Sequence, residues 1–449
     1  MLILLLIWIA VGLGLAWLVS QKRRGSAGLP LAYFLGISLI HVPGAILYLD
    51  TEDANVTRIG FEQTTLGMVA FLTGVIVARY AFVRPLGQRA SAGQTEAFTP
   101  QGLMALDRLA LLYLSIGSIA YFILLPLVGG IASAGAVVSA LGSLIMVGAC
   151  LRLWVAGKSR NRIKFWSTIA LLPLLPLATL LQGGFVGFGT YWVLAIVAFL
   201  FAQSERRLRY VLLAPAVFFV ALSLFVNYMA ARDEIRQLVW YEQAGIGARF
   251  DRIAKVFNDF EWLDLSNFRH RDAIDGRLNQ NQLVGLAVER LDMGVVEYAS
   301  GQTLGTMILG LIPRAVWPDK PTIGGGGTIV HDFTGLEFQE GTSVGAGQVF
   351  EFYVNFGSLG VIGGFLLWGW LCGRMDLRAI ECLRQGNQRR FLFWFLIALT
   401  LLQSGGNLLE IFVSAVSAAI TAYGIGYLLR RRGFARNVRS LPPVTRAAD

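Results

Sequence analysis

Apolar residues fill most of the chain in segments of membrane length, and one long polar stretch, 231–350, interrupts the series. A hydrocarbon core about 30 Å thick needs roughly 20 apolar residues per helix, and about eleven segments approach that length. They are 2–19, 29–49, 64–83, 108–127, 134–156, 165–182, 185–203, 210–230, 352–373, 391–405 and 408–429. The pattern predicts an all-α polytopic membrane protein with about eleven transmembrane helices and one large helical loop outside the membrane.

Composition supports this class. Hydrophobic residues make up 55% of the chain, charged residues only 15%, and the mean hydropathy is +0.60. Soluble domains carry about 25% charged residues, so a soluble globular fold is excluded. The first apolar segment follows no basic residue and is followed by Lys22, Arg23 and Arg24, which indicates a retained helix rather than a signal peptide.

The distribution of basic residues predicts the orientation. When the spans alternate, the basic clusters at 22–24, 84–89, 158–164, 206–209, 374–390 and 430–439 all fall on one side, which the positive-inside rule makes cytoplasmic. The net charge of +10 therefore reflects topology, and nucleic acid is not an expected partner. The expected organisation is spans at 1–230, the external loop at 231–350, spans at 351–430 and a basic cytoplasmic tail at 431–449.

The cysteine and histidine positions argue against metal chemistry. Cys150, Cys372 and Cys382 fall in spans or on the cytoplasmic side, so the loop has no cysteine for a disulfide. No cluster of Cys and His has the spacing of zinc ligands. We therefore expect neither a metal nor another cofactor.

Two helices are expected in the first part of the loop. Phe250, Ile253, Phe257 and Phe260 recur at helical spacing and predict an amphipathic helix without chemistry of its own. A second helix is expected from about Asp272 to Tyr298, with a buried stripe at Ile274, Leu278, Leu291, Val295 and Tyr298. Arg277 and Arg290 lie on this second helix. Each guanidinium can hold phosphate in a bidentate contact or can pair with a loop acid such as Asp275 or Asp292.

A rigid cationic turn is predicted next. Residues 302–313 are mostly apolar but too short to span the membrane, which indicates a re-entrant or interfacial helix. Arg314, Trp317 and Lys320 follow it between prolines, which stiffen the backbone. These side chains suit either a lipid-linked pyrophosphate or simple anchoring at the membrane surface.

Two candidate bases follow in the chain. His331 stands next to Asp332, and the two can form a proton-transfer pair. Glu351 and Asn355 are spaced to share one helix face at the mouth of the next span. Glu351 can serve as a base or can pair with an arginine of the loop. The glycines at 324–327 permit close approach to an anion but equally permit plain mobility.

The order of these motifs resembles bacterial O-antigen and oligosaccharide repeat-unit polymerases of the Wzy-like type. The resemblance rests on the Arg-rich helix, on I-PR-x-x-WP-x-KP from Ile312 to Pro321 and on E-x-Y-x-NFG-x-x-G from Glu351 to Gly360. It covers roughly residues 277–364. It implies a metal-independent, inverting membrane glycosyltransferase with GT-C-like architecture in the bacterial inner membrane, with the large loop in the periplasm.

The same resemblance implies partners and site residues. The substrates would be undecaprenyl-pyrophosphate-linked glycans within the lipid bilayer, and a chain-length regulator protein would be a further partner. The positions that match the family pattern are Arg277, Arg314, Lys320, Glu351, Tyr353 and Asn355. In one departure, Phe185 stands where many relatives carry an arginine after a glycine. Arg232, at the outer end of the eighth span, is the candidate substitute for that charge.

The chemistry of these residue types agrees with the resemblance. A departing pyrophosphate needs its negative charge stabilised, for which Arg277, Arg314 and Arg232 are the candidates, with Lys320 in support. The acceptor hydroxyl needs a base, for which Glu351 and His331 are the candidates.

Three other functional hypotheses remain at this stage. An O-antigen ligase would use the same chemistry with a lipid A-core acceptor. A lipid-linked glycan flippase or transporter would need no catalysis. Finally, the acidic residues of the first external loop, Asp50, Glu52 and Asp53, can form a different catalytic centre or only a solvated turn.

Overall fold

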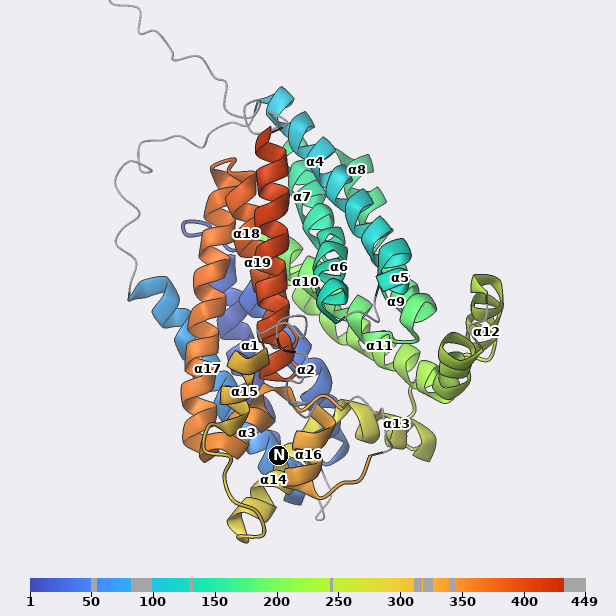
Figure 1. Ribbon diagram of the computed structural model, residues 1–449, viewed down its shortest axis with the longest axis vertical. Helices are drawn as coiled ribbons and strands as arrows, with labels where there is room; N and C mark the ends of the chain where they lie inside the picture. The colour runs from blue at the N-terminus through green and yellow to red at the C-terminus, as the bar shows by residue number, and fades with distance from the viewer. Residues whose placement is uncertain are drawn as a thin grey trace, which may run out of the picture.

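The protein is all-helical across the residues that the structure describes (Figure 1). A computed structural model describes residues 1–49, 55–81, 99–128, 132–242, 245–310, 317, 326–338 and 344–431. Within these ranges, 9 helical segments are long and apolar enough to cross a membrane. The predicted class, a polytopic α-helical membrane protein, is confirmed at this level.

The long apolar segments form the body of the bundle. They are α1 (Leu2–Ser20), α2 (Leu29–Leu47), α3 (Asn55–Tyr80), α4 (Pro100–Ile119) with the π-helical η1 (Ala120–Leu124) and α5 (Leu125–Val128), α6 (Ala132–Gly142) with α7 (Leu144–Ser159), α8 (Arg162–Ile169) with α9 (Leu174–Gly183), α11 (Arg207–Arg236) with η2 (Gln237–Tyr241), α17 (Gly347–Arg384) and α19 (Leu408–Arg431). Two further predicted spans correspond to shorter helices, α10 (Gly187–Gln203), of 17 residues, and α18 (Gln388–Thr400), of 13. At 1.5 Å per residue, α18 is only about 20 Å long and does not cross the hydrocarbon alone.

Close packing of α3 against α17 forms the centre of the bundle. A side chain at Gly74 would collide with the carbonyl oxygen of Leu366, and one at Gly369 with that of Phe71. Glycine at both positions therefore brings the two backbones together. Phe365, which is fully buried, packs beside Gly67 of α3.

A buried ion pair ties several loops together at one end of the bundle. Arg79 Nη1 lies 3.2 Å from Asp376 Oδ2, and neither side chain is exposed. Asp376 Oδ1 also accepts hydrogen bonds from the backbone N–H groups of Ala27 and Leu29, at 2.9 and 3.1 Å. The end of α3, the end of α17 and the turn after α1 therefore meet at one end, as alternating spans require.

A second contact brings another loop to the same end. Lys22 Nζ lies 2.9 Å from Glu205 Oε1 in the turn between α10 and α11. Both side chains are exposed, and the hydrogen bond from Lys22 lowers the pKa of Glu205. The basic clusters at 22–24, 206–209 and 374–390 thus share one end of the molecule.

The helices of the polar stretch lie in the opposite half of the molecule, most of them toward its end, whereas α12 projects to the side beyond the end of α11 (Figure 1). They are α12 (Ile246–Asn258), α13 (Phe268–Leu278), α14 (Gln280–Asp292), α15 (Gln302–Gly310) and α16 (Gly326–Thr334). The expected amphipathic helix is present as α12, which buries Ile253, although Phe250 is exposed and Phe260 lies beyond the helix end.

The single helix predicted from Asp272 to Tyr298 is wrong. The chain forms two helices, α13 and α14, which are separated at Asn279, where φ is −125° and ψ is 62°. The second ends at Asp292, and Val295 and Tyr298 lie beyond it with exposed side chains. The apolar spacing could not show this break, because it arises from hydrogen bonds that the Asn279 side chain makes with distant elements.

The first turns of α17 fold back on the rest of the helix. Phe356 and Gly357 have non-helical dihedral angles, and Gly357 has a φ of 61°, which favours glycine. Residues eight positions apart in a continuous helix are separated by about 12 Å. The Phe352 carbonyl oxygen nevertheless lies against Gly360, and the Phe352 and Phe365 rings are 5.5 Å apart. Residues 347–355 therefore form a re-entrant half-helix.

A non-helical segment, 401–407, joins α18 to α19 opposite this half-helix. Trp368 Nε1 donates a 3.3 Å hydrogen bond to the carbonyl oxygen of Leu401. Trp368 lies eleven residues past Gly357, or about 17 Å along the helix axis. The 401–407 segment therefore lies well inside the bundle, and the predicted span 391–405 ends early because helix α18 stops at Thr400.

Candidate functional site

A polar core forms where the re-entrant half-helix meets the 401–407 segment. Gln348, only 1% exposed, donates from Nε2 to the carbonyl oxygens of Gln403 and Gly406, both at 2.8 Å. Its Oε1 accepts a 2.8 Å hydrogen bond from the Tyr33 hydroxyl. Non-helical backbone at membrane depth must be paired within the protein or face a water-filled cavity, and Gln348 supplies such partners.

Glu351 lies one turn further along the half-helix and caps another helix. Its side chain is only 1% exposed, and its Oε2 accepts a 2.7 Å hydrogen bond from the backbone N–H of Leu408, the first residue of α19. A carboxylate is favourable at a helix N-terminus because the helix dipole is positive there. In this conformation Glu351 has no access to solvent and fixes the start of α19.

Glu410 is a second carboxylate in the same region. It lies in the first turn of α19, close enough to Glu351 for the two charges to repel each other. Its backbone N–H donates to Asn407 Oδ1 at 2.7 Å, whereas its side chain is exposed. Glu410 is therefore the more exposed carboxylate of this pair.

Asn355 joins the half-helix to α15. Asn355 and Glu351 share one helix face, as expected, since Asn355 Nδ2 donates to the Glu351 carbonyl oxygen at 2.7 Å. The same amide donates to Thr303 Oγ1 at 2.6 Å, and its Oδ1 accepts from the Gly301 N–H at 2.9 Å. These contacts fix the beginning of α15, after which the chain continues toward the expected cationic turn.

Tyr353 is buried beside Tyr298. It is 4% exposed, and the ring centroids of the two tyrosines are 6.5 Å apart. Its surroundings indicate packing between the half-helix and the segment before α15.

The junction between α13 and α14 is held by a buried hydrogen-bond network. Asn281, fully buried, places its Oδ1 2.7 Å from His41 Nδ1 and donates from Nδ2 to the His41 carbonyl oxygen at 2.7 Å. Asn279 Nδ2 donates to Thr57 Oγ1 at 3.1 Å. Helices α2 and α3 therefore fix this junction of the polar stretch onto the membrane bundle.

Asp275 belongs to this network and is not an ion-pair partner of Arg277. Its Oδ1 accepts from Asn279 Nδ2 at 2.7 Å, and its Oδ2 accepts from the Tyr48 hydroxyl at 2.8 Å. Partial burial, followed by the hydrogen bond to Asp275, raises the pKa of Tyr48 to about 12. This removes one of the acids that the sequence offered as a partner for Arg277.

Arg277 instead lies near Arg232, which projects from the end of α11. Burial, followed by the charge of Arg232, lowers the pKa of the Arg277 guanidinium. The Arg232 side chain is 15% exposed and lies 3.2 Å from an oxygen of Asp233, whose own side chain is 92% exposed. An ion pair so open to solvent contributes little, so the two guanidiniums form a site of net positive charge.

Further cations surround the turn between α9 and α10, where the family pattern expects one. The Arg236 guanidinium lies 4.7 Å from the centroid of the Phe185 ring, and Arg249 donates to the Leu181 carbonyl oxygen at 2.9 Å. Tyr228 donates to the Gly184 carbonyl oxygen at 2.9 Å. Phe185 thus has a guanidinium stacked on it, and Arg232 is one helical turn away from that guanidinium on α11.

The α13–α14 junction connects the cation pair to the polar core. Gln280, three residues after Arg277, donates to the carbonyl oxygen of Gly345 at 3.3 Å and lies against Gly347, the first residue of α17. Glu351 follows one helical turn later. The junction therefore links the segment that carries Arg277 to the start of the half-helix that carries Glu351, although no hydrogen bond or ion pair joins these cations to Glu351 or Glu410 in the described ranges.

Arg290 and His331 are not drawn into this assembly. Arg290 lies on α14 beside Gly335, in the turn after α16. His331 is exposed, and its Nδ1 lies 2.9 Å from the carbonyl oxygen of Leu336. No hydrogen bond or ion pair joins His331 to Asp332 or Glu351 in the described ranges, so the suggested proton-transfer pair is not formed in this conformation.

Several predicted site residues lie outside the described residues. These are Arg314 and Lys320 of the expected cationic turn and the acids Asp50, Glu52 and Asp53 of the first external loop. Trp317 is described and is 38% exposed. Within the described ranges, no group of three or more His, Cys, Asp or Glu residues could hold a metal ion.

Sequence reasoning missed the residues that organise the site. His41 stands inside the second apolar segment, and Gln348, Gln403 and Asn407 stand at or between apolar segments. A polar residue in an apolar stretch of membrane length is energetically costly unless it is paired. The presence of such residues in the sequence could therefore have indicated buried polar contacts. The pairing itself joins positions far apart in the chain.

Comparisons of the chain with protein-family models, with curated proteins and with solved structures each found no match.

Proposed function

We propose that the protein is a membrane glycosyltransferase that polymerises undecaprenyl-pyrophosphate-linked oligosaccharide repeat units. The observation that carries this proposal is that Arg277 lies near enough to Arg232 to feel its charge, with one exposed acid, Asp233, beside Arg232. Glu351 and Glu410 lie in the same half of the bundle. Two cations near each other suit a pyrophosphate, and a carboxylate in the same half of the bundle suits activation of a hydroxyl.

In this proposal the cations act on the leaving group. Inverting transfer breaks the bond between the sugar and the pyrophosphate of the donor, and the acceptor hydroxyl forms the new bond from the opposite face. Negative charge grows on the pyrophosphate as it leaves. Arg232 and Arg277 stabilise that charge without a metal ion, and Arg314 and Lys320, which follow α15 in the chain, add to this stabilisation.

The base role falls on Glu410, and Glu351 serves as a positioning residue. A base must come within hydrogen-bonding distance of the acceptor hydroxyl, which the exposed Glu410 side chain permits. Glu351 is enclosed and holds the N-terminus of α19, on which Glu410 stands. Asn355 and Tyr353 keep the half-helix in place, while Trp317, Arg290 and His331 are left for contacts with glycan or headgroup.

The proposal includes a topology. Helix α10 is one of the two remaining expected spans. Helix α18 forms the other together with the 401–407 segment, which makes eleven spans. The polar stretch then faces the periplasm, and the protein lies in the bacterial inner membrane. The shared end of the basic clusters supports this orientation.

An O-antigen ligase is the nearest alternative, since it uses the same donor and the same chemistry with a lipid A-core acceptor. A flippase is less consistent with the structure, because it needs cations along a path through the bundle. In the described part of the chain, Arg79 is the fully buried cation, and Asp376 neutralises it at the opposite end.

Reconstitution tests the proposal. The purified protein in proteoliposomes, given a lipid-linked repeat unit, should yield a ladder of products. A single transfer that requires added lipid A-core would identify a ligase, and lipid movement without a new glycosidic bond would identify a flippase.

The cation pair provides the matching variant test. Arg277→Gln should lower turnover by roughly 10²–10³, as loss of one preorganised donor does. Arg269→Gln, an exposed arginine on the same helix α13, is the matched control and should leave turnover unchanged. Equal turnover of the two variants would remove the pyrophosphate role from Arg277.

A further inference from the structure

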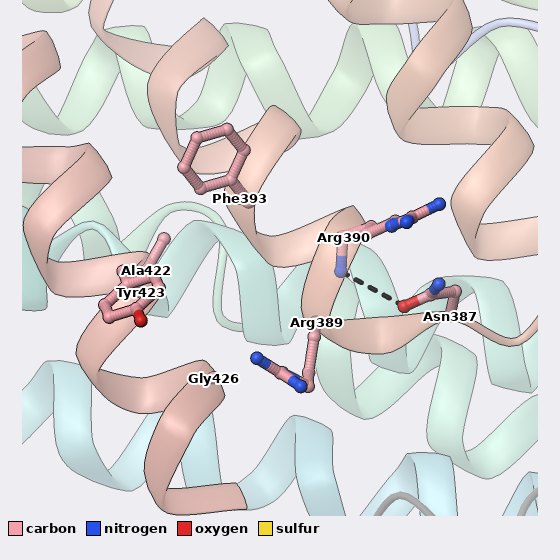
Figure 2. A pocket seen from close by; sticks show the side chains of 7 residues that line it. All are labelled: Asn387, Arg389, Arg390, Phe393, Ala422, Tyr423 and Gly426. Carbon is pink, nitrogen blue, oxygen red and sulfur yellow. Dashed lines mark hydrogen bonds between the residues drawn. The ribbon is translucent and has the colours of Figure 1, made fainter. Parts of the chain in front are cut away.

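A basic hollow lies at the other end of the bundle, between the beginning of α18 and the end of α19. It has a volume of about 420 Å³ and is open to the surroundings (Figure 2). Its lining residues are Asn387, Arg389, Arg390, Phe393, Ala422, Tyr423 and Gly426. Because it adjoins the turn that follows α17, it belongs to the end where the basic clusters meet.

The charges of this hollow are not neutralised within the described residues. Neither Arg389 nor Arg390 has an ion-pair partner there, and Arg389 Nε is buried without a hydrogen bond. The Arg389 side chain runs along Gly426, where a Cβ would lie 3.3 Å from Nε, so glycine leaves room for the guanidinium. Asn387 Oδ1 accepts from the Arg390 backbone N–H at 3.3 Å and caps α18 (Figure 2).

The position of these arginines on the helix adds to the positive potential. Both lie in the first turn of α18, where the helix dipole is also positive. Cations at a helix N-terminus destabilise the protein unless an anion compensates them. The arrangement therefore favours an anionic ligand, since two guanidiniums and the positive end of the α18 dipole border one hollow.

An apolar stripe continues from the hollow along α19 toward the middle of the bundle. Tyr423, Ile420, Val416 and Phe412 are 70%, 60%, 37% and 40% exposed, and they follow one another at steps of three or four residues. Such residues share one helix face. An occupant with an anionic head in the hollow can thus lay an acyl chain on this stripe.

We propose that the hollow binds the headgroup of an anionic phospholipid in the leaflet at this end of the bundle. The phosphate contacts Arg389 and Arg390, the Tyr423 hydroxyl lies at the level of the headgroup, and one acyl chain follows the stripe. Basic pockets between transmembrane helices on the cytoplasmic side are suited to such headgroups. The proposal does not depend on glycosyl transfer at the opposite end.

Native mass spectrometry of the full chain in detergent tests this proposal with phosphatidylglycerol as the probe. The wild type should retain one more phosphatidylglycerol than the double variant Arg389→Gln/Arg390→Gln, whose apparent affinity should fall roughly tenfold or more. Phosphatidylcholine should not bind with comparable affinity. Arg389→Lys/Arg390→Lys should keep most of the binding, and it provides the test if the glutamine variant does not fold.

A matched control uses an arginine of the same end that already has a partner. Arg378 is half-exposed and lies 3.5 Å from Glu381. Arg378→Gln should leave phosphatidylglycerol binding unchanged, whereas Arg389→Gln should weaken it. Equal loss in both variants would show only a general effect of net charge and would overturn the proposal. Inorganic phosphate that competes at the affinity of the lipid would overturn the lipid assignment in favour of a free-anion site.

Discussion

Substitution of Glu351 separates its structural role from catalysis. Glu351→Gln keeps a side-chain oxygen that can accept from the Leu408 N–H, so the N-terminus of α19 stays capped. Glu351→Ala leaves that buried N–H without a partner. An unsatisfied buried donor costs about 1–3 kcal/mol, so the alanine variant should unfold at a clearly lower temperature than the glutamine variant.

The effects of substitutions on turnover should differ from their effects on stability. If Glu410 is the base, Glu410→Gln should lower turnover by roughly 10²–10⁴ while the protein stays folded, because its side chain is exposed. Glu351→Gln should retain most of its turnover. The measurements are thermal unfolding in detergent and the product ladder after reconstitution.

The opposite pattern would refute this reasoning. An inactive but stable Glu351→Gln beside an active Glu410→Gln would assign the base to Glu351, and would require a conformation in which the half-helix opens. Equal stability of Glu351→Gln and Glu351→Ala would show that the contact with Leu408 contributes nothing to the fold.

The remaining predictions concern stability, topology, metals and the cationic turn. Asp376→Ala should destabilise the protein by about 3–5 kcal/mol in unfolding experiments, because Arg79 would stay buried without its counter-charge, and near-normal stability would contradict this. An impermeant maleimide added to intact spheroplasts should label a cysteine introduced at the exposed Met293 but not one at the exposed Gln385, and the reverse result would invert the topology. If guanidiniums stabilise the leaving group as proposed, polymerisation should survive excess EDTA, and activity that is lost and returns with a divalent ion would favour the acidic first loop. Arg314→Ala should lower turnover by roughly 10²–10³ with Arg314→Lys restoring only part, and an unchanged product ladder would exclude the role.

The sequence predicted those features that depend on local composition. Apolar length located the segments that became α1 to α11, α17 and α19, because burial in lipid requires an apolar surface around the whole helix. Spacing of three and four placed α12 and put Glu351 and Asn355 on one face. The basic clusters predicted that the loops around 22–24, 206–209 and 374–390 share one end, because the positive-inside rule depends only on the basic residues of each loop.

Features that depend on contacts between distant residues could not be read in the same way. The break at Asn279 is held by Thr57 and Asp275, and the early end of α18 is made possible by Gln348, which satisfies the backbone of the 401–407 segment. Glycine at 357 permits the reversal within α17 but does not require it. Periodicity carried none of this information.

In the candidate site, too, the sequence predicted local features but not contacts between distant residues. Arg277 was identified as a cation on a helix, but its partner was ambiguous until the contacts of Asp275 were known, and those contacts leave Arg277 beside Arg232. Membrane-embedded ends of helices need acceptors or donors from elsewhere in the chain. In this protein the groups that meet that need, Gln348 and Glu351, also set the position of Glu410. The same contacts therefore satisfy the non-helical backbone inside the bundle and position the proposed base. A variant that removes these contacts should also displace Glu410.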